Sequence, residues 1–478
     1  MFYGFNSAVK GLLASQRALY TTNHNISNAN TKGYSRQVVE QRATSPYKLP
    51  GIGFLGTGTE IYNITRIRDA FVDFKYWNET APLGEWEVKK DILTEIEKLM
   101  GEPSNSSFRQ YLDDFFSSLE EMSKNPSDMS YRKPVVENAV ALTKHINETA
   151  ERLMDMLKET EYNIEMKIKQ INSLTEQIAS LNRQIYSQEL DGKPANDLRD
   201  RRELLVDELS KIVNVRVNET PDGKYTVSVD GISIVDHIYF NKVLVNKDEN
   251  DNLIITWENG GEFRLKSGEL KGLLDVYSGN GDNNTYRGIP FYIKKLNEFA
   301  LGFAKKFNAV HKDGYGLNET RVEEGRNFFT IGDVNQAAAT ITINEEILND
   351  VTLIAASKIN GGPAEDNSNL LKLIGLRDDK KFFEGDDNVS QGTPDDFIKS
   401  MLSSMAVDSI QAKRLYNTQE LIRHNLETKR SSISGVNLDE EMADMVKFQH
   451  VYVAASMMIS TFDNIIDVTV NRLGNVGR

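Results

Sequence analysis

The sequence predicts a multidomain, mainly α-helical protein with β-rich inserts, in which the N- and C-terminal helices pair as an α-helical coiled coil. Apolar residues recur every seven positions near both ends of the chain and in its middle, which is typical of helices that pack along their length. The apolar period falls to two in a central segment, which indicates β-strands. With 478 residues the chain is too long for one hydrophobic core.

These patterns predict four parts. Both ends are expected to return to one place, with the inserts lying outside. The expected parts are residues 1–75 with 434–478 as a terminal coiled-coil and linker domain, 76–212 with 268–325 and 395–433 as a long helical-bundle domain, 213–267 as an outer β insert, and 326–394 as an outer mixed α/β insert.

The first helix is predicted from an apolar seam interleaved with small residues, which let a second helix approach closely. The seam is Phe5, Leu12, Leu19 and Ile26, and the small residues are Ala8, Ser15, Thr22 and Ala29. Glycines follow at residues 51–58 and satisfy the pattern GxGxxG. A dinucleotide site would need a buried strand before this pattern and a helix after it, and neither is predicted. We interpret the glycines as turns in a hairpin or long loop.

A long helix of coiled-coil character is predicted over 146–185, where Ile, Leu and Ala repeat in two seams. Asp191-Gly192-Lys193-Pro194 should end it, and Asn196 or Asp197 should cap a return helix. From Val213 alternating valines and Pro221-Asp222-Gly223 predict a β-hairpin. Helical periodicity resumes over 268–312 and again from Asp395.

The C-terminal helix is predicted to begin at Leu438, with Asn437 as its cap and Glu440 completing a capping box. It carries two apolar seams, so one partner cannot cover it. The first seam is Leu438, Met445, Tyr452, Ile459 and Ile466, and the second includes Phe448, Ala455, Phe462 and Thr469. The first helix is mainly basic and the last mainly acidic, which favours their pairing. Ordinary bundle packing within one chain would give similar stripes.

Three separated motifs resemble those of the axial proteins of the bacterial flagellum, which are the rod, hook and hook-associated proteins. The first spans residues 25–37 and contains Asn28, Asn30, Thr31, Gly33 and Tyr34 in the turn after the first helix. The second, Ser434-Gly435-Val436-Asn437-Leu438-Asp439-Glu440-Glu441, opens the last helix. The third combines residues 267–274, 308–311 and 327–329 in the family's order. The turn should require positive φ or a close backbone approach at Gly33.

The resemblance implies a structural subunit that polymerises at the junction between hook and filament. It implies as partners further copies of the chain, the hook protein, a second junction protein and an export chaperone that binds the C-terminal helix. It also implies a secreted protein in the flagellum, exported from the cytoplasm by the type III apparatus without a cleaved signal peptide. A cytoplasmic coiled-coil scaffold or adaptor is the alternative, but it gives no reason for the turn motif.

Composition limits the remaining classes of function. A net charge of −14 without a long basic run argues against a nucleic-acid partner. The absence of cysteine excludes disulfides and thiolate chemistry. Six scattered histidines and the lack of catalytic motifs predict no enzyme, no metal and no cofactor. Polar residues interrupt the N-terminal apolar run, so no signal peptide is expected, and no wholly apolar run of about 18 residues predicts a membrane span.

Overall fold

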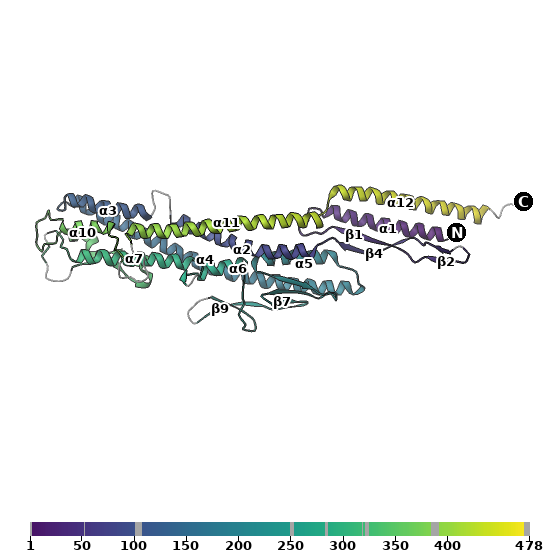
Figure 1. The fold of residues 1–478 in the computed structure, drawn as a ribbon, viewed down its shortest axis with the longest axis horizontal. Coiled ribbons are helices and arrows are strands. Elements are labelled where there is room, and N and C mark those ends of the chain that lie inside the picture. Colours follow the sequence, from purple (N-terminus) through teal and green to yellow (C-terminus); the bar gives the residue numbers. More distant parts are fainter. Residues whose placement is uncertain are drawn as a thin grey trace.

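A computed structural model describes residues 2–51, 53–100, 108–248, 253–282, 285–317, 319–320, 325–383 and 392–472. The molecule is elongated, with a helical body and a terminal arm that holds both ends of the chain (Figure 1). The arm contains α1 (Phe2–Ser27), β1 (Gln37–Ala43), β2 (Tyr47–Leu49), β3 (Gly53–Leu55), β4 (Thr59–Arg66), α12 (Leu438–Asp467) and a π-helical turn (Val468–Arg472). The predicted helical residue Leu473 lies outside the described residues.

Long helices run along the body. They are α2 (Ala70–Leu99), α3 (Phe108–Lys124), α4 (Met129–Gln188), α5 (Asn196–Ile212), α6 (Glu269–Ser278), α7 (Ile289–Lys312) and α11 (Pro394–Ser434). Asp69 and Asp128 cap α2 and α4, and Thr393 forms a capping box with Asp396 at the start of α11. The long helix predicted over 146–185 is α4, which begins earlier, at Met129 after its cap Asp128, and has 60 residues.

The turn between α4 and α5 is a 3₁₀ helix (Glu189–Asp191) that ends at Gly192, whose φ is 78°. The prediction of a cap from Asn196 or Asp197 is wrong, because Ala195 occupies the cap position and makes no side-chain hydrogen bond there. The Asn196 amide instead donates to the Ile64 carbonyl at 2.8 Å, which ties α5 to the arm.

The β segment forms a sheet beside α4. Its four-stranded antiparallel sheet has the order β5-β6-β7-β8, and β9 pairs with β10. The strands are β5 (Arg216–Glu219), β6 (Tyr225–Val229), β7 (Ile232–Asp236), β8 (Tyr239–Phe240), β9 (Val243–Lys247) and β10 (Leu253–Trp257). Their inward residues share a core with α4, α5 and α6. The predicted hairpin is confirmed as β5 and β6.

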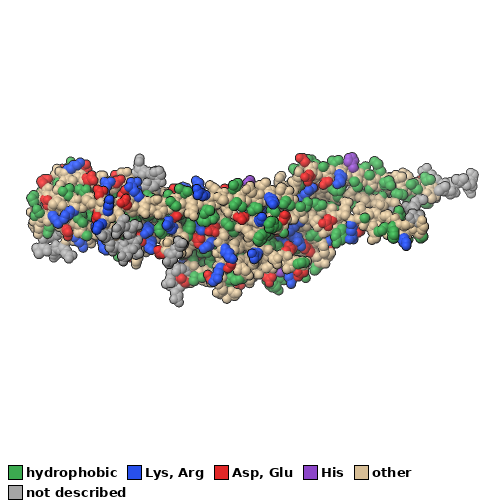
Figure 2. All heavy atoms as spheres, viewed as in Figure 1, with side chains coloured by type: hydrophobic (Ala, Val, Ile, Leu, Met, Phe, Trp, Pro, Cys, Tyr) green, Lys and Arg blue, Asp and Glu red, His purple; other side chains and the backbone are tan. Residues whose placement is uncertain are grey.

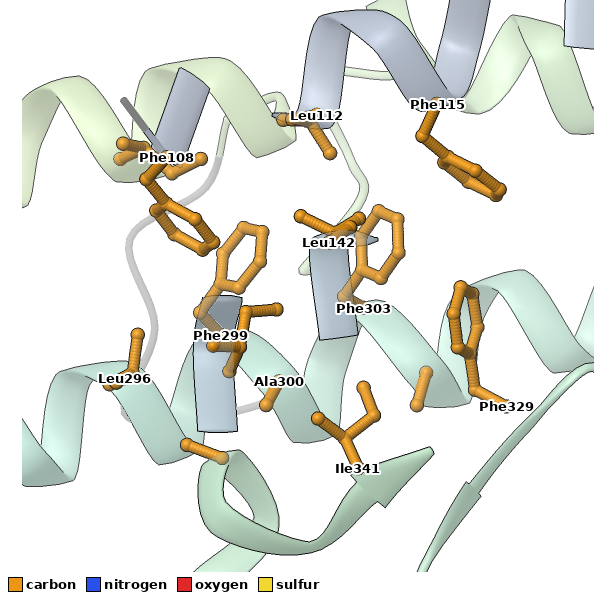
Figure 3. Packing of buried hydrophobic residues seen from close by; sticks show 14 of the residues in the cluster. Phe108, Leu112, Phe115, Leu142, Leu296, Phe299, Ala300, Phe303, Phe329 and Ile341 are labelled. Carbon is orange, nitrogen blue, oxygen red and sulfur yellow. The ribbon is translucent and has the colours of Figure 1, made fainter. Parts of the chain in front are cut away.

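The mixed segment lies at the end of the body opposite the arm (Figure 1). It contains β11 (Phe329–Ile331), η3 (Val334–Gln336), α8 (Ala337–Thr340), β12 (Ile341–Ile343), α9 (Glu345–Asn349), η4 (Val351–Leu353), α10 (Ser368–Gly375) and η5 (Leu376–Asp378). Its apolar side chains join the core of α3, α4 and α7, where phenylalanines such as Phe115, Phe303 and Phe329 pack together (Figure 3). The segment thus shares the body's main core, although it was expected to lie outside it.

Candidate assembly surface

The two terminal helices pair antiparallel. Near one end of the pair Gly4 lies against Phe462, and near the other the Asn25 amide donates to Glu441 at 3.0 Å. A Cβ atom at Gly4 would lie 2.5 Å from Cζ of Phe462, so the ring occupies the space that a side chain would need. This contact fixes where the tip of α1 meets α12.

The predicted seam of α1 is not its most buried face. Phe5, Leu12, Leu19 and Ile26 are half-buried, while the helix face that β1, β4 and α12 cover consists of smaller side chains. The buried residues of this face are Ala14, Ser15, Ala18, Thr21, Thr22 and Asn25. The small residues therefore do permit close approach, and the strands take part of the space expected for a second helix.

Most of α12 is uncovered in the isolated chain. Its main partner among the described elements is α1, and Glu441 is its one buried residue. Of the first predicted seam, Tyr452, Ile459 and Ile466 are half-buried, as is Phe462 of the second, whereas Leu438 and Met445 are exposed. Hydrophobic side chains are visible on the surface of the arm (Figure 2).

Apart from Leu438 and Met445, the exposed large apolar residues of α12 form two stripes. In an α-helix, residues that lie four or seven positions apart share one face. We name the two stripes stripe A, which is Met442, Val446, Val453 and Met457, and stripe B, which is Val451, Met458 and Ile465. At 100° per residue the stripes lie on either side of the face that contacts α1. Covering α12 would thus need partners on two sides.

The exposed apolar surface also changes one expectation about membranes. Within Pro394–Val470 an 18-residue window reaches a mean hydropathy of 1.3, and none of it is buried. By length and composition alone, this helical stretch could cross a membrane, although no run is wholly apolar. The mean hydropathy is high without a wholly apolar run because the polar residues in this part of the helix are uncharged. Residues 448–462 contain no Asp, Glu, Lys or Arg.

The turn after α1 is held by hydrogen bonds. The Tyr34 hydroxyl donates to Asn25 Oδ1 at 2.7 Å, and burial raises the pKa of this hydroxyl. Asn28 donates to the His24 carbonyl, and Thr31 donates to the Asn28 side chain. Gly33 has the expected positive φ, 82°, and a Cβ there would lie 3.3 Å from Leu204 of α5. Asn30 is exposed.

The turn also joins α11 to α12. The Arg36 backbone N–H donates to the Ser434 carbonyl at 2.8 Å, and its guanidinium pairs with Glu440 and Glu441 at 3.0 and 2.6 Å. Asn437 caps α12 by accepting from the Asp439 N–H. Glu440 faces Arg36, so the predicted capping box is replaced by an ion pair. The opposite charges of the two ends meet here.

Buried ion pairs attach the arm to the body. The Ser35 N–H and hydroxyl both donate to Asp200, and Arg66 pairs with Asp200 at 2.7 Å. Arg66 and Arg68 both pair with Glu203. Although burial raises the pKa of Glu203, these two arginines lower it below its usual value. We call Ser35, Arg66, Arg68, Asp200 and Glu203 the arm–body cluster.

A second group of charges extends this attachment to α11. Arg430 pairs with Asp73 at 2.9 Å and with Asp207 at 2.8 Å, and the Trp77 indole N–H also donates to Asp207. Burial raises the pKa of Asp207 despite these partners. Neither group could be predicted from the sequence, because the members of each come from distant segments. The one available signal was the density of charges in residues 197–207, within an otherwise apolar helix pattern.

The described residues contain no group of three or more His, Asp or Glu side chains arranged to hold a metal ion. An open groove of about 810 Å³ lies between α1, the β1–β4 ladder and the α4–α5 turn. The arrangement as a whole is a paired-helix arm with an uncovered apolar surface, fixed to a rigid body by buried charges. Such an arrangement is suited to association with other chains.

Two protein families match parts of the chain. Residues 93–329 match the family described as the flagellar hook-associated protein FlgK helical domain, and residues 428–473 match the flagellar basal body rod FlgEFG protein C-terminal family. Flagellar hook-associated protein 1 from Bacillus subtilis (strain 168) is 29% identical, over 100% of this chain and 99% of that protein. Its counterpart from Escherichia coli (strain K12) is 26% identical, over 98% and 99%.

A solved structure shares the fold. The flagellar hook junction protein FlgK from Burkholderia pseudomallei superposes with a TM-score of 0.61 at 13% sequence identity, covering 75% of this chain and 100% of that one. The mainly helical, multidomain fold is therefore one that a hook junction protein also adopts.

Proposed function

The chain belongs to the family of flagellar hook-associated protein 1, and from this we propose how it works as a structural subunit of the junction between hook and filament. It acts in the bacterial flagellum and assembles with the flagellar axial components. In our proposal the terminal arm makes the assembly contacts and the body keeps the arm in position. The alternative function, that of a cytoplasmic coiled-coil scaffold or adaptor, is not favoured.

The observation that carries this proposal is the uncovered surface of α12. Burying apolar area contributes about 25 cal/mol per Å², so a helix with two exposed stripes gains free energy when neighbours cover it. Stripe A and stripe B lie on different sides of α12, and each calls for its own neighbour. Identical subunits that contact one another through unlike surfaces in two directions build an open helical array. The apolar composition of this helix is explained by such packing without a membrane.

We extend the proposal to individual residues and parts. Phe5, Leu12, Leu19 and Ile26 hold α1 in the arm, and the seam residues of α12 divide between α1 and neighbouring chains. The assembly unit consists of residues 1–75 with 434–478. The body consists of residues 76–212 with 268–325 and 395–433. Residues 213–267 and 326–394 are additions to the body. The change from helix to extended backbone at Gly435 supports a boundary there.

The remaining partners also belong to the proposal. The hook protein contacts one end of the assembled array of subunits, a second junction protein contacts the other end, and an export chaperone shields α12 before assembly. An amphipathic helix with anchors at i, i+3, i+4 and i+7 suits a chaperone groove. The chain leaves the cytoplasm without a cleaved signal peptide. It has no catalytic role and needs no cofactor, in keeping with relatives that are named for a structure.

Immunogold labelling of isolated flagella tests the proposal. A tag inserted after Gly223, in the exposed turn between β5 and β6, should place gold at the boundary between hook and filament. Cells that express the untagged chain provide the background. Label along the filament, or tagged chain found only in the cytoplasm, would contradict the proposed place.

A further inference from the structure

Methionine is concentrated on the last helix. The helix α12 has 30 of the chain's 478 residues but four of its 13 methionines. All four are exposed, Met442 at 47%, Met445 at 36%, Met457 at 65% and Met458 at 51%. An oxidant in solution reaches exposed thioethers first. In the free chain, α12 is therefore the element where oxidisable side chains gather.

Most methionines of the body are shielded by packing. Four of them belong to its main core and are at most 4% exposed, namely Met100, Met122, Met401 and Met405. Two methionines of α4 are exposed on the body, Met129 at 42% and Met166 at 43%. These two match Met442 in exposure and differ from it in place. They serve as internal controls for any effect of oxidation on α12.

Three of the methionines of α12 lie on the surfaces to which we assign assembly. Met442 and Met457 belong to stripe A, and Met458 belongs to stripe B. The adjacent Met457 and Met458 thus place one thioether in each stripe. Residues 448–462, which surround this pair, contain no Asp, Glu, Lys or Arg. Neighbours that cover both stripes would bury the pair in an apolar contact.

Oxidation makes a methionine side chain polar. When hydrogen peroxide reacts with the thioether, sulfur gains one oxygen atom and loses two electrons, the O–O bond breaks, and the peroxide is reduced to water. The product is a sulfoxide. Burying a polar group without a hydrogen-bond partner is unfavourable, and an apolar neighbour offers no such partner. Because the chain has no cysteine, no thiol competes with these thioethers for the oxidant.

We propose that Met442, Met457 and Met458 are oxidation sites, and that their conversion to sulfoxides by a peroxide stops α12 from assembling with neighbouring subunits. The sites are open in the free chain and covered in the array, so the peroxide acts on the subunit before assembly. Methionine sulfoxide reductases reverse the reaction, which makes the block reversible. This inference rests on the proposed function, because it requires that neighbours cover α12.

Partial oxidation of the unaltered chain tests this inference. Purified full-length chain is treated with hydrogen peroxide until its exposed methionines are partly oxidised, and it is then added in excess to hooks isolated from cells that lack this chain. Peptide mass spectrometry measures the sulfoxide share at each methionine in incorporated and in unbound chains. We expect the share at Met457 and Met458 to be about tenfold lower in the incorporated chains. At Met129 and Met166 the two fractions should agree.

The outcomes separate the two proposals. Equal sulfoxide shares at Met457 and Met458 in both fractions would overturn the inference and leave the junction role in place. If the untreated chain does not join the hooks, the junction role fails and the inference fails with it. Circular dichroism of the oxidised free chain should be unchanged, because these side chains already meet water, and a loss of helix would overturn an effect on the contact alone. Treating the unbound chains with methionine sulfoxide reductase should restore their incorporation.

Discussion

At the scale of single residues, the joint between arm and body depends on polar groups that sequence patterns do not connect. Glycine at position 33 was predictable, since the turn motif implied a positive φ, and the structure gives 82°. The partners of the turn were not, because Ser35 and Arg66 reach Asp200 and Glu203 more than 100 residues away. Periodicity reports which face of a helix is apolar and carries no information on long-range ion pairs.

Gly33→Val should loosen the arm from the body. A β-branched residue at positive φ costs about 1–2 kcal/mol, and its side chain would also press against Leu204. Limited proteolysis between residues 28 and 69 measures the effect, and we expect faster cleavage in the variant. Gly192→Val is the matched control, because φ there is 78° and no atom lies within 4 Å. Equal cleavage of the two variants would contradict the role of the contact with Leu204.

Glu203→Gln should lower stability and flatten its acid dependence. The pKa of Glu203 is lowered in the folded chain, so the carboxylate stabilises the fold above the unfolded pKa of about 4.3 and loses this effect as pH falls through the lower folded value. Removing one partner of a buried ion pair costs about 3–5 kcal/mol. Melting followed from pH 7 down to pH 3 should show both changes.

Glu262→Gln serves as the comparison for that experiment. Glu262 pairs with Arg264, but its side chain is 65% exposed, and surface pairs contribute little. We expect its melting profile to follow the unchanged chain throughout. If Glu203→Gln follows the same profile, the arm–body cluster does not stabilise the fold.

At the scale of elements, α12 was the most predictable part of the chain and also the one whose partners were hardest to assign. Its start at Leu438 follows from Asn437 as the cap, and its excess of apolar surface follows from the heptad pattern. The sequence could not show which apolar residues face α1, because both sets share the sevenfold period. The two strands beside α1 were not predicted as a pair, since residues 51–58 indicated only turns in a hairpin or long loop, and these strands change which face of α1 is buried.

Met457→Asp should abolish assembly and leave the monomer intact. Met457 is 65% exposed in stripe A, so a charge there meets water in the isolated chain and would meet apolar surface in the array. Circular dichroism and melting should be unchanged, while incorporation into hooks should be lost. Ile410→Asp in α11 is the matched control with the same exposure and should still assemble. Assembly of the Met457 variant would remove stripe A from the interface.

Substitutions in the first predicted seam of α12 are expected to act differently from Met457→Asp. Tyr452 and Ile459 are half-buried against α1, so Tyr452→Asp and Ile459→Asp should loosen the arm as well as block assembly. The body should keep its melting temperature, because its core lies in separate clusters. A loss of stability throughout the body in the Ile459 variant would show that the arm and body fold as one unit.

At the scale of the whole molecule, a body with its own core carries an arm whose last helix is largely uncovered in the isolated chain. The multidomain, mainly helical fold and the pairing of the terminal helices were predicted from the sequence. The shared phenylalanine core of the mixed segment was not, since Phe328, Phe329 and Phe382 lie in short irregular elements without a clear period. Such contacts are set by the packing of many segments at once.

Hydrogen–deuterium exchange on the free chain and on assembled hooks tests the central claim most directly. In dilute monomer α12 should exchange fast, because one partner helix offsets little of its ordering entropy, whereas the core positions of α4 should exchange slowly. In assembled hooks α12 should become as protected as α4, and α4 should not change. Slow exchange of α12 in the free chain, or no gain of protection on assembly, would contradict an arm that is completed by neighbouring subunits.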